Sequence, residues 1–128
     1  MPYKSKEDMP PQCPPSDVVS ENKEPVYRFI EGDEITECDF LNHKEAKKPY
    51  PDHLLCEALA ISLFDDEEAA YKKQKRIKSL KAMKLVKGKL KRECGVYKID
   101  HTHHMNLWLF ENVNMLKVFT ERWGDKWI

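Results

Sequence analysis

Three histidines within four residues form the most unusual local feature of the sequence. They are His101, His103 and His104, and the first two would point to the same side of an extended chain. Imidazoles at this spacing can bind zinc, with Cys94 as a third ligand. His104 directly precedes an apolar segment and can instead act as a general acid or base in a cleft. The structural alternative is a surface turn with solvated histidines, and no H-E-x-x-H motif accompanies the cluster.

A basic segment follows an acidic run in the second half of the chain. Eleven basic residues and no acidic residue lie between Lys72 and Arg92, although the formal net charge of the protein is zero. Such asymmetry is typical of a surface that binds nucleic acid or phosphate. The alternative is a solvated helix face followed by a sheet edge, where lysine is common. The candidate contact residues are Lys72, Lys73, Lys75 and Arg76.

Aromatic residues give a third set of candidates. Trp108 lies in an apolar segment, where core packing explains a tryptophan as well as ligand binding does. Trp127 is next to the last residue and is harder to bury. It is either an anchor for a protein partner or docks on the same chain.

Glycine-rich and nucleophile motifs are missing from the sequence. With four glycines there is no G-x-x-x-x-G-K-[ST] or G-x-G-x-x-G segment to hold phosphates. No G-x-S-x-G motif surrounds Ser62, and a buried serine usually bonds to backbone, so a hydrolase nucleophile is not indicated. Arg28 lies between large apolar residues and is either exposed on an open sheet face or a buried anion clamp.

The hydrophobic pattern that must position these residues mixes two periods. It predicts strands over 26–30, 60–64, 83–90, 95–100 and 105–110. It also predicts three helices: a short one that ends at about residue 47, one that follows the acidic run at 65–68, and one over 115–123. The order predicts an α+β fold with a small, mostly antiparallel sheet and two or three helices. One long helix to Val86, ended by Gly88, competes with a break near 79–81, and we favour the break.

The first residues differ in composition from the rest. Residues 1–24 hold five of the eight prolines, which predicts a disordered arm that adds nothing to the core of a single domain at 25–128. No apolar run approaches the length of a membrane helix, and the first residues lack the apolar region of a secretory signal. We therefore expect a cytoplasmic protein with no membrane segment.

The four cysteines form no C-x-x-C pair. Two disulfides are an alternative, but without an export signal the sequence favours free thiols in a reducing compartment. The residues are Cys13, Cys38, Cys56 and Cys94.

Four segments resemble a group of small, uncharacterised bacterial proteins. The segments are VYRFI, DFLNHKEAKKP at 39–49, AISLFDDEEAA at 60–70 and HHMNLW at 103–108. The resemblance covers about residues 26–116 and implies a compact domain rather than a reaction, because the group has no established activity. Ala46 stands where that group has a glycine, so a tight turn there is not implied.

A second, weaker likeness is to the ADP-ribosyltransferase-like fold. Those domains carry an arginine or histidine on the first strand, a serine or threonine on a later strand and often a glutamate further on, and Arg28, Ser62 and Glu111 occur in that order. The likeness implies that the arginine grips the phosphates of NAD, the serine orients the ribose and the glutamate stabilises the transition state.

Three functional hypotheses follow. The leading one is a non-enzymatic bacterial module that binds a macromolecule, most simply a protein partner, without a cofactor. The second is an ADP-ribosyltransferase-like enzyme or a degenerate relative, which would use NAD. The third is a nucleic-acid-binding module that contacts its ligand through residues 72–92. Oligomeric state is left open.

Overall fold

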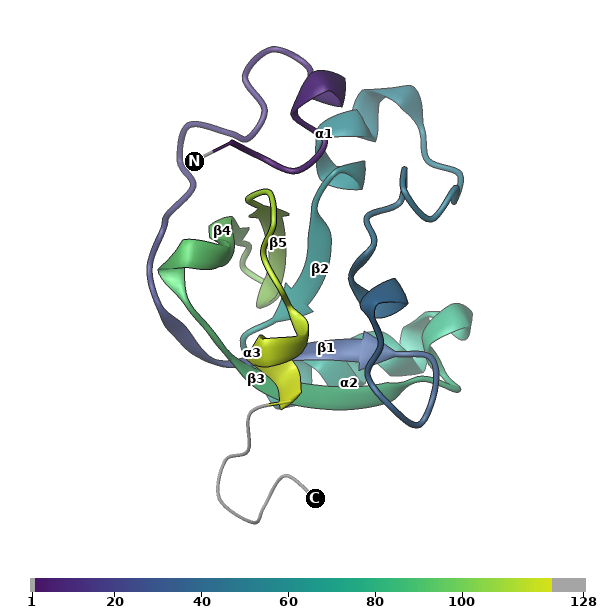
Figure 1. The fold of residues 1–128 in the computed structure, drawn as a ribbon. Coiled ribbons are helices and arrows are strands. Elements are labelled where there is room, and N and C mark those ends of the chain that lie inside the picture. The colour runs from purple at the N-terminus through teal and green to yellow at the C-terminus, as the bar shows by residue number, and fades with distance from the viewer. Residues whose placement is uncertain (1, 121–128) are drawn as a thin grey trace.

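Five antiparallel strands form one sheet in the order β3-β1-β2-β5-β4 (Figure 1). The computed structural model describes residues 2–120. The strands are β1 (Lys23–Ile30), β2 (Ile61–Phe64), β3 (Lys84–Leu90), β4 (Gly95–Ile99) and β5 (His104–Leu109). With three helices they confirm the predicted α+β class. β3 begins after a short 3-10 turn at Lys78–Leu80, so the predicted break is also confirmed.

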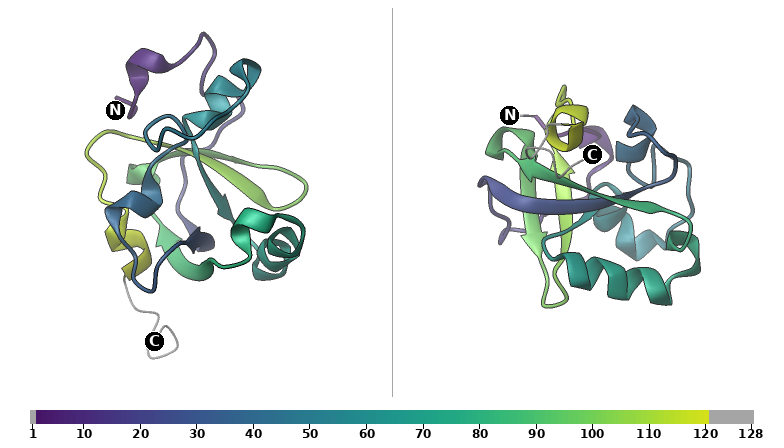
Figure 2. Two further views of the ribbon diagram at one scale, coloured as in Figure 1. Left: turned by 90° about the vertical axis from the view of Figure 1, so that its right-hand side faces the viewer. Right: turned by 90° about the horizontal axis from the view of Figure 1, so that it is seen from below.

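The helices are α1 (Leu55–Ala58), α2 (Glu67–Arg76) and α3 (Leu116–Thr120). α2 and α3 lie on opposite faces of the β1–β3 pair, whereas α1 lies beside the start of β2 (Figure 1 and Figure 2). The side chain of Asp66 caps α2 by accepting a 2.9 Å hydrogen bond from the amide of Ala69. Acidic residues fill the first turn of α2 and basic residues its last turn, which suits the helix dipole.

Alternation along the strands divides the buried side chains between the two faces. The main core, with Val26 of β1, Leu63 of β2 and Met105 of β5, extends to Phe119 of α3. Tyr27 and Phe29 point the other way and pack with Phe64 and Ala70 beneath α2.

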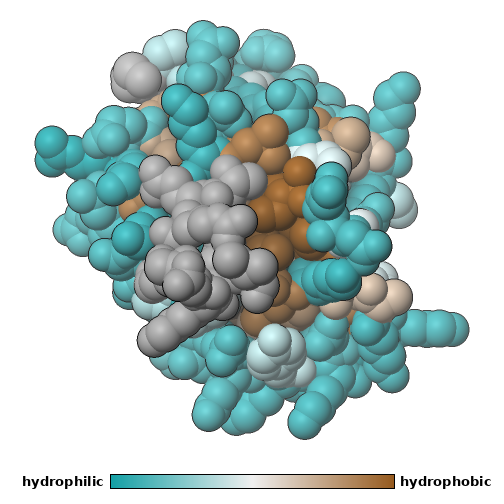
Figure 3. Space-filling model, turned by 60° about the horizontal axis from the view of Figure 1, so that its bottom comes forward, coloured by the Kyte–Doolittle hydropathy of each residue, from teal (hydrophilic) through white to brown (hydrophobic). Residues whose placement is uncertain are grey.

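A surface depression lies beside β1 and β3. It is lined in part by Ile30, Ile35, Leu85, Val86 and Phe119. Figure 3 shows apolar side chains gathered on the lower face of the molecule, with hydrophilic ones along the right-hand side of the patch. β3 is an edge strand and carries Lys84, Lys87 and Lys89, as the sheet-edge alternative for the basic segment predicts.

The N-terminal segment is packed against the domain, which corrects the prediction of a disordered arm. Tyr3 pairs with Phe110 and Val19 pairs with Tyr97 in isolated antiparallel bridges. Side chains of the segment, including Met9 and Val18, pack against a buried cluster around Trp108. The prolines prevent a continuous ladder of backbone hydrogen bonds in this segment. Single bridges and apolar side-chain contacts can still hold it against the domain, because they do not require a regular strand. The segment therefore contributes to the core.

A disulfide joins Cys13 to Cys56, which corrects the prediction of four free thiols. The bond connects the N-terminal segment to α1 across 43 positions of the sequence. Such a pairing depends on spatial proximity, which residue spacing does not reveal. Cys38 is free and exposed, and Cys94 is free and buried.

The segment before the second strand is mostly irregular rather than helical. In place of the predicted helix up to residue 47 there is only a 3-10 turn, Glu37–Phe40. A capping box between Thr36 and Asp39 caps the N-terminus of this turn. Lys47 then takes a left-handed backbone conformation with φ of 58°, which interrupts any longer helix. The predicted C-terminal helix begins one residue late, at Leu116, and its continuation past 120 lies outside the described residues.

Membrane spanning is not indicated within residues 2–120, where no helix has the length and apolar character needed to cross a bilayer.

Gly95, at the start of β4, fits because it has no side chain. A Cβ there would overlap the carbonyl oxygen of Trp108 and lie 3.0 Å from the Cα of Leu109. We expect Gly95→Ala to lower the free energy of unfolding by about 3 kcal/mol, measured by urea titration. Gly32→Ala is the control, because its nearest neighbouring atom lies at 3.8 Å. Equal stability of the two variants would contradict this account.

Candidate functional site

A pocket of about 330 Å³ lies where β1 separates from β2. The two strands share a single register pair, Tyr27 with Phe64, and β1 runs across the end of β2 (Figure 1). The opening is lined by β1, β2 and β5, the loop at 41–48, the side of α2 and the turn before β3. Its volume is within the range of small-molecule sites.

Arg28 bridges the gap between the separating strands. Its Nε donates to the carbonyl of Asp39 at 2.7 Å, and its Nη1 donates to the carbonyl of Ser62 at 2.6 Å. The guanidinium carbon lies 5.8 Å from the centre of the Phe40 ring. Burial lowers the pKa of Arg28 to about 10, so the group stays charged at neutral pH. Within residues 2–120, Nη2 makes no hydrogen bond.

Ser62 and His104 form a hydrogen-bonded pair inside this pocket. The distance from Ser62 Oγ to His104 Nε2 is 3.0 Å. In the β2–β5 register Ser62 lies opposite Asn106 and Phe64 lies opposite His104, so the two side chains share a face as diagonal neighbours. The His104 ring also meets Phe64 edge to face, with centroids 5.5 Å apart. These contacts hold the imidazole against the hydroxyl.

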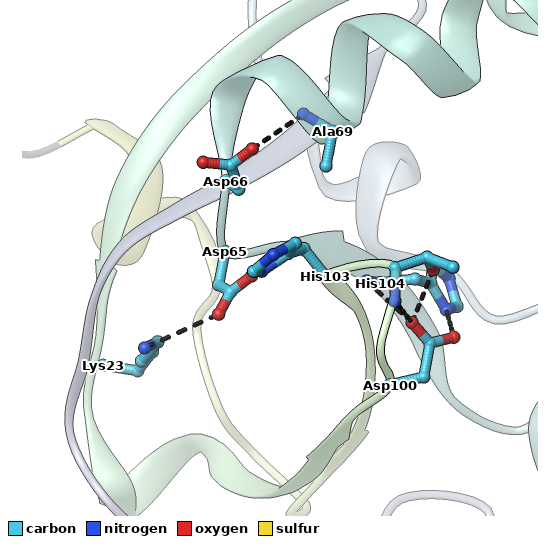
Figure 4. A network of polar contacts seen from close by, with 8 residues as sticks. Lys23, Asp65, Asp66, Ala69, Asp100, His103 and His104 are labelled. Atoms are coloured by element: carbon cyan, nitrogen blue, oxygen red, sulfur yellow. Dashed lines mark hydrogen bonds and ion pairs between the residues drawn. The ribbon is translucent and has the colours of Figure 1, made fainter.

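Asp100 lies on the other side of the His104 ring (Figure 4). Its Oδ2 is 3.9 Å from Nδ1 of His104, while its Oδ1 accepts hydrogen bonds from the backbone of Thr102 and His104. Burial lowers the pKa of His104, Asp100 opposes that shift, and Lys73 adds to it. The net shift is downward, so His104 is neutral at pH 7 and can accept a proton.

His43 and Lys48 come to the same pocket from the loop at 41–48. Burial lowers the pKa of His43, and the charges of Lys48 and Arg28 lower it further. His43 is therefore also neutral at pH 7. Lys73 of α2 completes the set of cationic residues in the pocket.

A separate polar network ties His103 to the sheet. Its Nδ1 lies 2.9 Å from Oδ1 of Asp65, and Oδ2 of Asp65 lies 3.7 Å from Nζ of Lys23 (Figure 4). His103 has φ of 66° in the turn before β5. This left-handed residue directs neighbouring histidines to different environments, with His104 in the pocket and His103 beside α2.

The proposed zinc ligands are not brought together. Cys94 is buried in the main core, whereas His101 and His103 are exposed in the β4–β5 turn. Within the described part of the chain, no group of three or more His, Cys, Asp or Glu side chains is arranged to hold a metal ion.

Glu111 does not line the pocket that contains Arg28 and Ser62. It is exposed after β5, where its amide donates to the carbonyl of Pro2, and it lines a different depression. Of the three residues suggested by the ADP-ribosyltransferase likeness, Arg28 and Ser62 therefore line one pocket, and Glu111 lies outside it.

The remaining predicted residues do not form one site. Trp108 is buried, and its indole Nε1 donates to the carbonyl of Cys56 at 2.9 Å. Trp127 lies outside the described residues. Lys73 reaches the pocket, while a second depression beside His101 and His103 is lined by Lys72, Lys73, Lys75 and Arg76.

Comparison with known proteins adds no assignment. No protein-family model matches this sequence, and comparisons with curated proteins and with solved structures find no significant match. The functional argument therefore depends on the pocket itself.

Sequence reasoning missed Asp100, His43 and Lys48. Asp100 directly precedes the histidine cluster, so the string DHTHH was a signal for a carboxylate beside an imidazole. His43 and Lys48 had no comparable signal, because they reach the pocket only through an irregular loop.

Proposed function

We propose that this protein binds a small anion that carries an apolar group. The observation that carries the proposal is the charge of the pocket. Three permanent cations, Arg28, Lys48 and Lys73, line it with a single carboxylate, that of Glu31. The guanidinium offers Nη2 while its other contacts keep it in place, which is the preorganisation that anion recognition needs.

The rest of the pocket suits an apolar group on the ligand. Phe29, Phe64, Ile77, Leu80 and Met83 contribute to its walls. Ligand sites of this size are commonly apolar, with a few polar groups that fix orientation. Phosphate, sulfate and carboxylate share the chemistry that the cationic side chains recognise.

Affinity should increase as the pH falls below the pKa of an ordinary histidine, about 6.5. The pKa values of His104 and His43 are both lowered, so both rings are neutral at pH 7 and add positive charge only in acid. A bound anion favours protonated imidazole, and by linkage protonation favours the anion. A probe whose own charge is constant is needed, and phenyl sulfate meets that requirement.

The test is a titration of the full chain with phenyl sulfate, followed by backbone amide NMR shifts and calorimetry. We expect shifts at Ser62 and His104, and a threefold to fivefold weaker affinity for Lys73→Gln, because the charge of a partly exposed lysine contributes under about 1 kcal/mol. Lys72→Gln is the matched control, since Lys72 lies outside the pocket on the same helix. Equal shifts with neutral benzyl alcohol, or no shifts with millimolar phenyl sulfate, would refute anion recognition.

The hypotheses of macromolecule binding remain predictions. Lys72, Lys75 and Arg76 are exposed on α2, which favours a contact with nucleic acid only if affinity falls steeply with salt. The ADP-ribosyltransferase hypothesis requires another residue to stabilise the transition state, because Glu111 does not line the pocket. A cytoplasmic location also remains a prediction, and the disulfide favours an oxidising compartment instead.

A further inference from the structure

We infer that Ser62 is a nucleophile, that His104 is its general base, and that the protein cleaves an ester bond in its ligand. The inference rests on the proposed anion site for the class of substrate, an ester that also carries a negative charge. The assignment of Ser62 as the nucleophile is independent of the anion site. Ser62 Oγ and His104 Nε2 are already at hydrogen-bond distance, 3.0 Å, which is the geometry that proton transfer requires.

Paired strands hold the two side chains in this arrangement. Ser62 and His104 belong to β2 and β5, which are in register along the whole of β2, from Ile61 with Leu107 to Phe64 with His104. A pair on regular strands keeps its geometry better than a pair on loops. The partly buried hydroxyl also opens into the pocket rather than being enclosed in the core.

The electrostatic surroundings keep His104 ready to accept a proton. Burial is the largest cause of the lowered pKa of His104; Asp100 opposes it, and Lys73 lowers the pKa further by a smaller effect. The imidazole is therefore neutral at pH 7, and Asp100, 3.9 Å from Nδ1, can stabilise the imidazolium once it forms. The other ionisable side chains that line the pocket are Arg28, Glu31, His43 and Lys48.

Arg28 supplies a cation for the oxyanion. Its Nη1 is fixed to the backbone carbonyl of Ser62, and its Nη2 has no partner among the described residues. A donor held in place before the reaction stabilises charge that develops in the transition state.

The chemical steps balance without a further reactant other than water. Ser62 Oγ forms a bond to the acyl carbon and its proton passes to His104 Nε2. The bond from carbon to the leaving oxygen then breaks, and His104 returns the proton to that oxygen. Water, deprotonated by His104, then forms a bond to the acyl carbon. The bond from that carbon to Ser62 Oγ breaks, His104 returns the proton to Oγ, and the acid is released.

A fluorophosphonate tests the nucleophile without knowledge of the natural ester. Attack by Ser62 Oγ would form an O–P bond, release fluoride and pass the hydroxyl proton to His104. We expect one adduct on the full chain by intact mass, located at Ser62 by peptide mapping. Labelling should disappear in Ser62→Ala and slow by at least about hundredfold in His104→Gln, because general-base catalysis contributes about that much or more.

Two matched controls and a pH profile separate this role from a structural one. Ser20→Ala removes a hydroxyl that bonds to the carbonyl of Arg92 outside the pocket, and His103→Gln removes the neighbouring imidazole that bonds to Asp65, so both should label like the wild type. The labelling rate should rise with pH to a plateau, with its midpoint below the usual histidine value, about 6.5. Thermal unfolding establishes that every variant is folded.

Absence of an adduct on folded wild type at pH 8, or an adduct that persists in Ser62→Ala, would overturn the inference. If phenyl sulfate still binds in that case, the anion site stands without the nucleophile. If labelling depends on Ser62 and His104 but phenyl sulfate neither binds nor slows it, the nucleophile stands and the anionic substrate class is wrong.

Discussion

Trp108→Ala should lower the free energy of unfolding by about 4 kcal/mol. The indole is 1% exposed and lies at the centre of a cluster that joins the sheet to the N-terminal segment. Its removal leaves a large cavity and also leaves the carbonyl of Cys56 without the indole donor. Urea titration measures the change.

Trp108→Phe separates the two contributions. The phenyl ring keeps most of the packing but cannot donate to Cys56, so we expect a loss of about 1 to 2 kcal/mol. Tyr71→Ala is the exposed aromatic control and should be nearly neutral, because Tyr71 is 44% exposed. A loss from Trp108→Ala no larger than that from Tyr71→Ala would mean that the N-terminal segment does not cover the indole.

Removal of the disulfide should also cost about 4 kcal/mol. The bond closes a loop of 43 positions, and reduction restores the freedom of that loop to the unfolded chain. We expect Cys13→Ala and reduced wild type to unfold at similarly lower urea concentrations than oxidised wild type.

Cys38→Ala is the control for the disulfide, since Cys38 is exposed and unpaired. Reductant should leave the stability of Cys13→Ala unchanged, because no bond remains to be broken. If reductant does not alter the wild type either, the N-terminal segment is not covalently fixed and its contribution to the core is smaller than the structure indicates. The effects of Trp108→Ala and Cys13→Ala should not add, because both residues belong to one cluster.

Local physical chemistry in the sequence determined most of the elements. The acidic run before α2 supplies its own cap at Asp66, and hydrogen bonds within a few residues decide where that helix begins. Successive side chains of β1, β2 and β5 point to opposite faces of the sheet, whichever strands pair with them. The predicted strands and the break before β3 therefore agree with the structure.

Tertiary structure decided the parts that depend on residues distant in the chain. Cys13 meets Cys56 only because the proline-rich segment packs against the domain and pairs with Tyr97 and Phe110, and no local pattern predicts that path. Ser62 and His104 are 42 positions apart, and the register of β2 with β5 joins them. The sequence suggested both residues separately, as a buried serine and as an acid or base, but pairing across strands depends on long-range packing, which a local pattern does not specify.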